Sequence, residues 1–208
     1  IHTHKFVSNK FSIYNTFLYK EKLAYNYQSL GLHPWHLAEI NAENEIISIE
    51  QNICKNTVLA IGECGLDKIC KTDFGLQIEV FEKLISLSDK YNKPLIIHCV
   101  KAFNEILNLR KKSDLNLPWI IHGFNENQGI AKKLNDKNIY LSAGKLLFNE
   151  KSRIHKSFTE INLDYLFFET DDSDYHISEI YEFAAKILNL NQNILISKIE
   201  ENFKKVFE

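Results

Sequence analysis

Short apolar runs separated by amphipathic stretches dominate the chain. The clearest runs, rich in Ile, Leu, Val and Phe, are "TVLAIG", "PLIIH", "PWIIH", "NIYLSAG" and "DYLFFET". Continuous apolar segments of this length are typical of strands buried on both faces of a parallel sheet. Together with strands expected at Ile1, within 11–18 and ending at Leu32, they predict eight strands.

Helical periodicity fills most of the intervals between these runs. One apolar stripe joins Leu76, Val80, Phe81, Leu84 and Leu87, and the segment 191–207 repeats the pattern with Ile196, Ile199, Phe203 and Val206 facing inward. Alternation of strand and helix predicts repeated βαβ units, and eight strands are what a closed TIM-type (β/α)8 barrel needs. The first third is short, so we expect an α/β barrel whose first one or two helices are short or missing.

Length and composition favour an ordinary globular protein. The 208 residues, 45% hydrophobic and 25% charged, predict one domain over residues 1–208. The 25 Lys and Arg against 27 acidic residues give a net charge of -2, which excludes a basic surface for gripping long duplexes, although a short strand end could still bind. The oligomeric state stays open, with a monomer slightly favoured.

The cysteines and the hydropathy bear on the compartment. Four cysteines without paired spacing, in a chain of this length, are interpreted as reduced thiols and predict a cytoplasmic protein. No apolar run has the length of a membrane span, so we expect no membrane partner. Because the chain contains no methionine, residues are expected to be missing before Ile1.

The informative feature is that the apolar runs end in side chains able to bind a metal. In a parallel barrel all strands end at one face, so residues at those ends converge on a common site. In an extended strand, two histidines at the spacing of "IHTH" point the same way. The candidate metal ligands are therefore His2, His4, Glu63, His98, His122 and Asp171.

Each of these residues has a simpler interpretation when taken alone. The pair His2 and His4 can be a remnant of a terminus, a lone strand-end histidine is more often a packed core residue, and Asp171 is suited to a helix N-cap. A thiolate ligand next to Glu63 is also possible, although strand alternation points Cys64 the other way. The joint occurrence favours a metal site of mixed nitrogen and oxygen ligands, suited to zinc, manganese or iron, and dinuclear if one carboxylate bridges.

The blocks "IHTH", "GLHPWH", "AIGECGLD", "PLIIHCVKA", "IIHGF" and "FFETD", in this order, resemble the TatD family of metal-dependent deoxyribonucleases. The resemblance extends from Ile1 to Asp171. It implies a TIM-type barrel with two divalent ions, of which zinc, manganese and magnesium are candidates. By analogy, His2, His4 and Asp171 would hold one ion, His98 and His122 the other, and Glu63 would bridge them.

The chain departs from the family pattern around these ligands. It has "IIHCVKA" where relatives usually have "IIHSRDA", "HGFNE" for "HCFSG" and "ETDDS" for "ETDAP". These changes leave the ligands intact and put the identity of the substrate in doubt. The resemblance makes His33 a candidate substrate contact, against a packed histidine. Lys101, which would open the next helix, is a candidate phosphate contact, against a solvated lysine.

The predicted activity is hydrolysis of phosphodiester bonds in DNA, from strand ends or on single strands. Two ions can activate water and neutralise a phosphodiester, so we expect Glu63 and Asp171 to be catalytic, with Asp171 accepting or orienting the proton of the attacking water. The alternative is hydrolysis of an amide, a lactone or an aminoacyl ester by the same centre. A third hypothesis is a binding protein with a degenerate barrel. That hypothesis predicts that metal ligands are missing, whereas every expected ligand is present.

Overall fold

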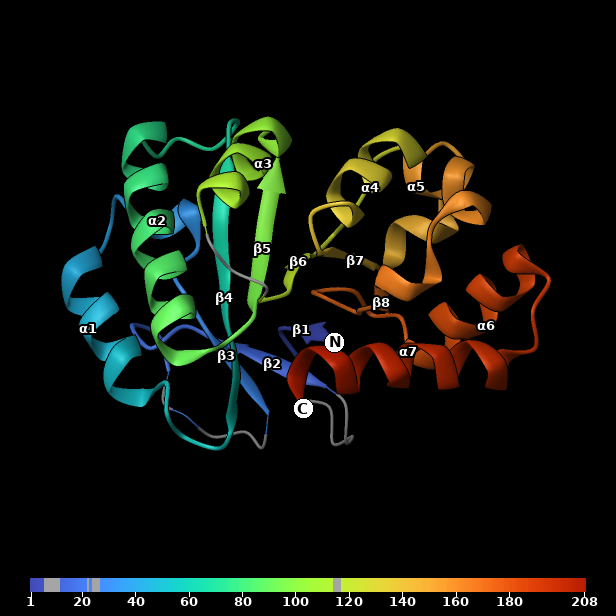
Figure 1. The fold of residues 1–208 in the computed structure, drawn as a ribbon, viewed down its shortest axis with the longest axis horizontal. Helices are drawn as coiled ribbons and strands as arrows, with labels where there is room; N and C mark the ends of the chain where they lie inside the picture. Colours follow the sequence, from blue (N-terminus) through green and yellow to red (C-terminus); the bar gives the residue numbers. More distant parts are fainter. Residues whose placement is uncertain (6–11, 22, 24–26, 114–116) are drawn as a thin grey trace. The chain divides into compact units, whose positions relative to one another are not determined.

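Strands and helices alternate along the chain (Figure 1). The computed structural model describes residues 1–5, 12–21, 23, 27–113 and 117–208. The eight strands are β1 (His2–Thr3), β2 (Ile13–Thr16), β3 (Gln28–Leu30), β4 (Val58–Asp67), β5 (Leu95–Val100), β6 (Trp119–Ile121), β7 (Ile139–Ala143) and β8 (Leu166–Phe168). The α-helices are α1 (Ala42–Asn52), α2 (Phe74–Tyr91), α3 (Phe103–Lys112), α4 (Gln128–Asn135), α5 (Arg153–Ser157), α6 (Ile177–Leu188) and α7 (Gln192–Phe207). Short 3₁₀ helices are η1 (Pro34–His36), η2 (Lys145–Phe148), η3 (Phe158–Glu160) and η4 (Leu163–Tyr165).

The chain forms two compact units. We call Ile1–Ser12 with Ile120–Glu208 the terminal unit, because it holds both chain ends, and Ile13–Trp119 the middle unit. The expectation of a single domain over residues 1–208 stays a prediction.

The middle unit is built on four parallel strands in chain order, β2 to β5. Tyr14 pairs with Gln28 and Ile61 with Leu95, so each strand runs beside the next one in the sequence. Helix α2 packs along β4 (Figure 1). Asp73 caps its N-terminus by accepting a hydrogen bond from the Leu76 N–H at 2.8 Å. The helix ends at Asn92, which adopts the left-handed conformation with φ of 53°.

The terminal unit contains the parallel pair β7 and β8, with β1 joined to the chain after β8 by a parallel bridge between Thr3 and Asp171. Helix α7 buries Leu195, Ile199, Phe203 and Val206. The inward face is thus the predicted one, except that Leu195 is buried where Ile196 was expected. A buried polar residue on this face, Asn202, donates to the carbonyl oxygens of Leu163 and Leu166 at 2.7 and 2.9 Å.

The predicted strands all occur. The weak strand expected within 11–18 is Ile13–Thr16, while Phe11 lies outside the described residues. In the described ranges no helix precedes η1, which agrees with the expected loss of the first helices. None of the helices in those ranges combines the length and the apolar character that crossing a membrane requires.

Replacing Asn202 by Ala should lower the free energy of unfolding by about 1–3 kcal/mol. The substitution leaves two carbonyl groups without their side-chain donor at the start of β8. Urea denaturation measures the change. Asn193→Ala, at an exposed position of the same helix, is the matched control and should leave stability unchanged or slightly higher; equal losses in both variants would contradict the role given to Asn202.

Candidate metal centre

The middle unit gathers His33, Glu63 and His98 from three neighbouring strands: His33 follows β3, whereas Glu63 and His98 lie within β4 and β5. One ligand atom from each lies within 4.8 Å of the others. Oε1 of Glu63 is 3.1 Å from His98 Nδ1 and 3.1 Å from His33 Nε2. We call these three residues with Asp67 the middle-unit cluster. Parallel pairing of β3, β4 and β5 places these residues side by side, with Glu63 and His98 in the carboxyl-terminal halves of their strands, which is why residues so distant in sequence converge.

The strand geometry sets Glu63 against His98. Gly65 pairs with His98 in the register of β4 and β5, and a Cβ added at Gly65 would lie 2.2 Å from the His98 carbonyl oxygen. Only glycine permits this approach. The N–H of Glu63 donates to Oδ1 of Asn15, which Ser29 also contacts at 3.2 Å. Strands β2 and β3 therefore fix the backbone from which Glu63 projects.

Asp67, the last residue of β4, orients His98 from behind. Its Oδ2 is 3.1 Å from His98 Nε2 and accepts the indole N–H of Trp35 at 2.7 Å, while Oδ1 accepts the N–H groups of Ile69 and Cys70. Burial by itself would raise the pKa of Asp67. The hydrogen bonds from Trp35, Ile69 and His98 outweigh burial and hold that pKa below its usual value.

The ring nitrogens of His33 and His98 have different hydrogen-bond partners. Both ring nitrogens of His98 face a carboxylate, Nε2 that of Asp67 and Nδ1 that of Glu63. With the proton of the neutral ring assigned to Nε2, where it donates to Asp67, the Nδ1 lone pair faces Glu63. Two lone pairs at 3.1 Å need a proton or a metal ion between them, and a histidine backed by a carboxylate is the usual arrangement at metal sites. His33 Nδ1 instead accepts the backbone N–H of Trp35 at 3.2 Å, so the neutral ring carries its proton on Nε2 and offers a donor.

The terminal unit gathers His2, His122 and Asp171, with His4 beside them. One ligand atom from each of the first three lies within 4.8 Å of the others. Oδ1 of Asp171 is 3.6 Å from His2 Nε2 and 3.5 Å from His4 Nε2. The rings of His2 and His122 are 4.6 Å apart. These four residues with Glu169 form the terminal-unit cluster.

The backbone holds Asp171 in an unusual conformation. Its φ is 51°, a region that residues other than glycine rarely adopt. The Asp171 N–H donates to the His2 carbonyl at 3.1 Å, and the His4 N–H donates to the Asp171 carbonyl at 3.2 Å. The segment His2–His4 therefore holds the backbone of Asp171 by a hydrogen bond on each side. Residues kept in a strained conformation in this way often belong to functional sites.

Glu169 is a buried carboxylate that the sequence analysis did not single out, although it stands in the "FFETD" block. It is 1% exposed, and its Oε1 accepts the Gly123 N–H at 2.6 Å and lies 3.7 Å from His122 Nδ1. Within the part of the chain that the structure describes, Oε2 has no hydrogen-bond partner. A buried carboxylate is expensive without a compensating cation, so this cluster also fits a metal ion.

Two other sequence-based expectations can be compared with the structure. Cys64 is fully buried with its Sγ near the Ile96 carbonyl, and burial raises the pKa of the thiol, so Cys64 is a packed thiol rather than a ligand. Lys101 does not open helix α3: it precedes the N-cap, is exposed, and has a φ of 54°. In the described ranges its ammonium makes no ion pair, and its contact with a phosphate stays a prediction.

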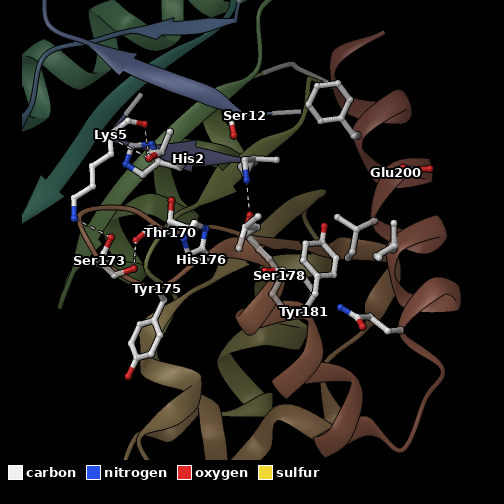
Figure 2. Close-up of a pocket in the computed structure, with 18 of the residues that line it drawn as sticks. His2, Lys5, Ser12, Thr170, Ser173, Tyr175, His176, Ser178, Tyr181 and Glu200 are labelled. Carbon is white, nitrogen blue, oxygen red and sulfur yellow. Dashed lines mark hydrogen bonds between the residues drawn. The ribbon is translucent and has the colours of Figure 1, made fainter. Parts of the chain in front are cut away.

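The terminal unit also contains a cavity of about 520 Å³ beside β1, α6 and α7 (Figure 2). Its wall includes Phe168, Ile177 and Ile196, and His2 lies at its edge. His4, His122 and Asp171 are not among the lining residues. Of the four candidate ligands in this unit, His2 is therefore the one that borders the cavity.

Comparison with known proteins supports the same interpretation. The model of the family described as TatD related DNase matches residues 3–208. An uncharacterized metal-dependent hydrolase of Haemophilus influenzae is 30% identical over 168 residues, which cover 76% of this chain and 62% of that protein. A human 3'-5' RNA nuclease is 35% identical over 97 residues, 46% of this chain and 12% of its own length.

A crystal structure of a TatD homologue from Escherichia coli K12 has the same fold. It superposes with a TM-score of 0.82 and 18% identity, covering 94% of this chain and 85% of that one. The chain therefore has the TIM-type (β/α)8 fold expected from its strand pattern, and it belongs to the TatD related DNase family of metal-dependent hydrolases.

Proposed function

We propose that this chain hydrolyses phosphodiester bonds in nucleic acid, acting on unpaired strands or strand ends, with one divalent ion held by each cluster. The observation that carries the proposal is the pairing of Glu63 with His98 at 3.1 Å, backed by Asp67. Nitrogen and oxygen ligands of this kind suit zinc or manganese, and carboxylates also suit magnesium. When bound, such ions lower the pKa of a water and neutralise the charge of a phosphodiester.

The ligands follow from the chemistry of each cluster. In the middle unit, Glu63 and His98 offer lone pairs. In the terminal unit, His2, His4, His122 and Asp171 would hold the second ion, and Glu169 would orient His122. This differs from the family analogy, which assigns His122 to the same ion as His98. The sharing of Glu63 between two ions stays a prediction.

The chain's own residues would handle the protons. The Asp171 carboxylate is 27% exposed and lies against two histidines, so it can accept a proton from the attacking water. His33 Nε2 lies 3.1 Å from Glu63 Oε1, and its N–H would turn from that carboxylate to donate a hydrogen bond to an oxygen of the substrate. These roles for Asp171 and His33 are general base and hydrogen-bond donor.

The family description supports DNA as the substrate, and the human relative's activity on RNA supports including RNA. The net charge of -2 supports action on short unpaired stretches rather than long duplexes. The four free cysteines support a reducing compartment, hence a cytoplasmic location.

Metal dependence tests the function directly. Chelation should abolish hydrolysis of single-stranded DNA or RNA oligomers and of bis-p-nitrophenyl phosphate, and addition of Mg²⁺, Mn²⁺ or Zn²⁺ should restore it and raise the Tm. Hydrolysis of acyl esters alone in the same panel would favour the carbonyl-directed alternative. Activity that is indifferent to chelation on every substrate would refute the proposal.

Asp171→Asn should reduce turnover by about 100- to 10,000-fold, because the amide cannot accept the proton of the attacking water. Metal content, measured by elemental analysis, should partly survive. Asp172→Asn removes a neighbouring exposed carboxylate that pairs with Lys145 and should retain full turnover. A fully active Asp171→Asn variant would remove Asp171 from the mechanism.

Asp67→Asn should weaken metal binding by about 10- to 100-fold, because the carboxylate that orients His98 is lost. Isothermal titration with Mn²⁺ or Zn²⁺ measures the affinity. Asp73→Asn makes the same change at the N-cap of α2, where an amide oxygen can still cap the helix, and should bind the ion normally. Unchanged affinity in Asp67→Asn would show that His98 needs no support from Asp67.

A further inference from the structure

Trp35 is oriented opposite to the usual surface tryptophan. A tryptophan at a surface normally buries its apolar body and points its N–H toward water. Here the indole N–H is directed inward onto Asp67 at 2.7 Å, while the side chain is 56% exposed. The apolar part of the ring therefore faces solvent, and a ligand that covers it would gain hydrophobic free energy.

The ring is also held firmly. Asp67 is 1% exposed and accepts two backbone N–H groups on its other oxygen. On the other side, the N–H of Trp35 itself donates to His33 Nδ1, and Pro34 restricts the backbone just before it. Because hydrogen bonds fix both the backbone and the indole of Trp35, a ligand that binds to the exposed ring would cause little further loss of side-chain entropy.

The Trp35 ring lies next to the two histidines of the middle-unit cluster. The Trp35 ring centroid lies 4.9 Å from that of His33 and 5.9 Å from that of His98, with interplanar angles of 83° and 78°. Both histidine rings are therefore roughly perpendicular to the indole, in T-shaped arrangements. All three residues belong to the middle unit. A substrate group held at Glu63 and His98 would thus have its next neighbour over Trp35.

We propose that Trp35 is a stacking platform for one unpaired nucleobase, next to the phosphodiester group that the middle-unit cluster would hold. The inference rests on the proposed function. Base-on-aromatic stacking tolerates any base, because every base has a flat π face. A base inside a duplex has both faces covered by its neighbours, so the platform selects single strands and frayed ends.

The test compares substrates with and without bases. Trp35→Ala should raise the KM for a single-stranded oligomer by about 5- to 150-fold with little change in kcat, and should not change the KM for an oligomer of the same length made of abasic sugars. Trp35→Phe keeps a ring face but loses the N–H that Asp67 accepts, and should recover most of the KM increase seen in Trp35→Ala. Ile194→Ala removes an equally exposed apolar side chain, 62% exposed, on α7 and should behave as wild type.

Fluorescence gives a readout that does not need turnover. Trp35 and Trp119 are the only tryptophans, and Trp119 is fully buried. Thymidine monophosphate should quench the wild-type emission and leave Trp35→Phe, which retains only Trp119, unaffected. Quenching without hydrolysis of any phosphodiester would keep the platform and reject the proposed function.

Three results would overturn the platform while leaving the proposed function in place. The first is an equal KM increase on base-bearing and abasic oligomers in Trp35→Ala, which would mean that Trp35 acts only through Asp67 and His98. The second is a Trp35→Phe variant as impaired as Trp35→Ala. The third is hydrolysis of oligomers with no quenching of Trp35.

Discussion

A buried carboxylate behind a histidine is the interaction on which each cluster depends. Asp67 stands behind His98 in the middle unit, and Glu169 stands beside His122 in the terminal unit; each carboxylate is 1% exposed. Burying a negative charge is costly unless donors or cations surround it. The fold supplies donors from the backbone, and the remaining demand for positive charge is what makes both places suitable for a metal ion.

The two carboxylates achieve this in different ways. Asp67 is almost saturated, since it accepts hydrogen bonds from Trp35, Ile69 and Cys70 besides meeting His98. In Glu169, by contrast, one carboxylate oxygen is hydrogen-bonded: Oε1 accepts the N–H of Gly123, whereas Oε2 has no hydrogen-bond partner among the described residues. Hydrogen bonds therefore hold the supporting carboxylate Asp67 of the middle-unit cluster, whereas Glu169 of the terminal-unit cluster depends more on an ion for its charge balance.

Backbone geometry contributes as much as side-chain chemistry. Gly65 lets β4 approach β5 closely enough to pair Glu63 with His98, and β1 brackets Asp171 in a left-handed conformation. In both cases a main-chain constraint, imposed by strand pairing, aims a carboxylate. This explains how a chain with a short first third can keep its ligands: the strands that aim them are present, while the described part of that third contains no helix before η1.

The sequence by itself determined the strand pattern, the TIM-type fold and the candidate ligands Glu63, His98, His122 and Asp171. It could do so because burial on both faces leaves a continuous apolar run, and a residue able to bind a metal follows four such runs. The strand ends differ from this expectation, since β4 and β5 continue past Glu63 and His98 to Asp67 and Val100. The sequence did not single out Glu169, nor the pairing of Trp35 with Asp67, and it placed Lys101 in a helix that begins two residues later. Those features were decided by tertiary structure, because hydrogen bonds between residues 32 or 46 positions apart depend on strand register and loop conformation, which leave no periodic trace in the sequence.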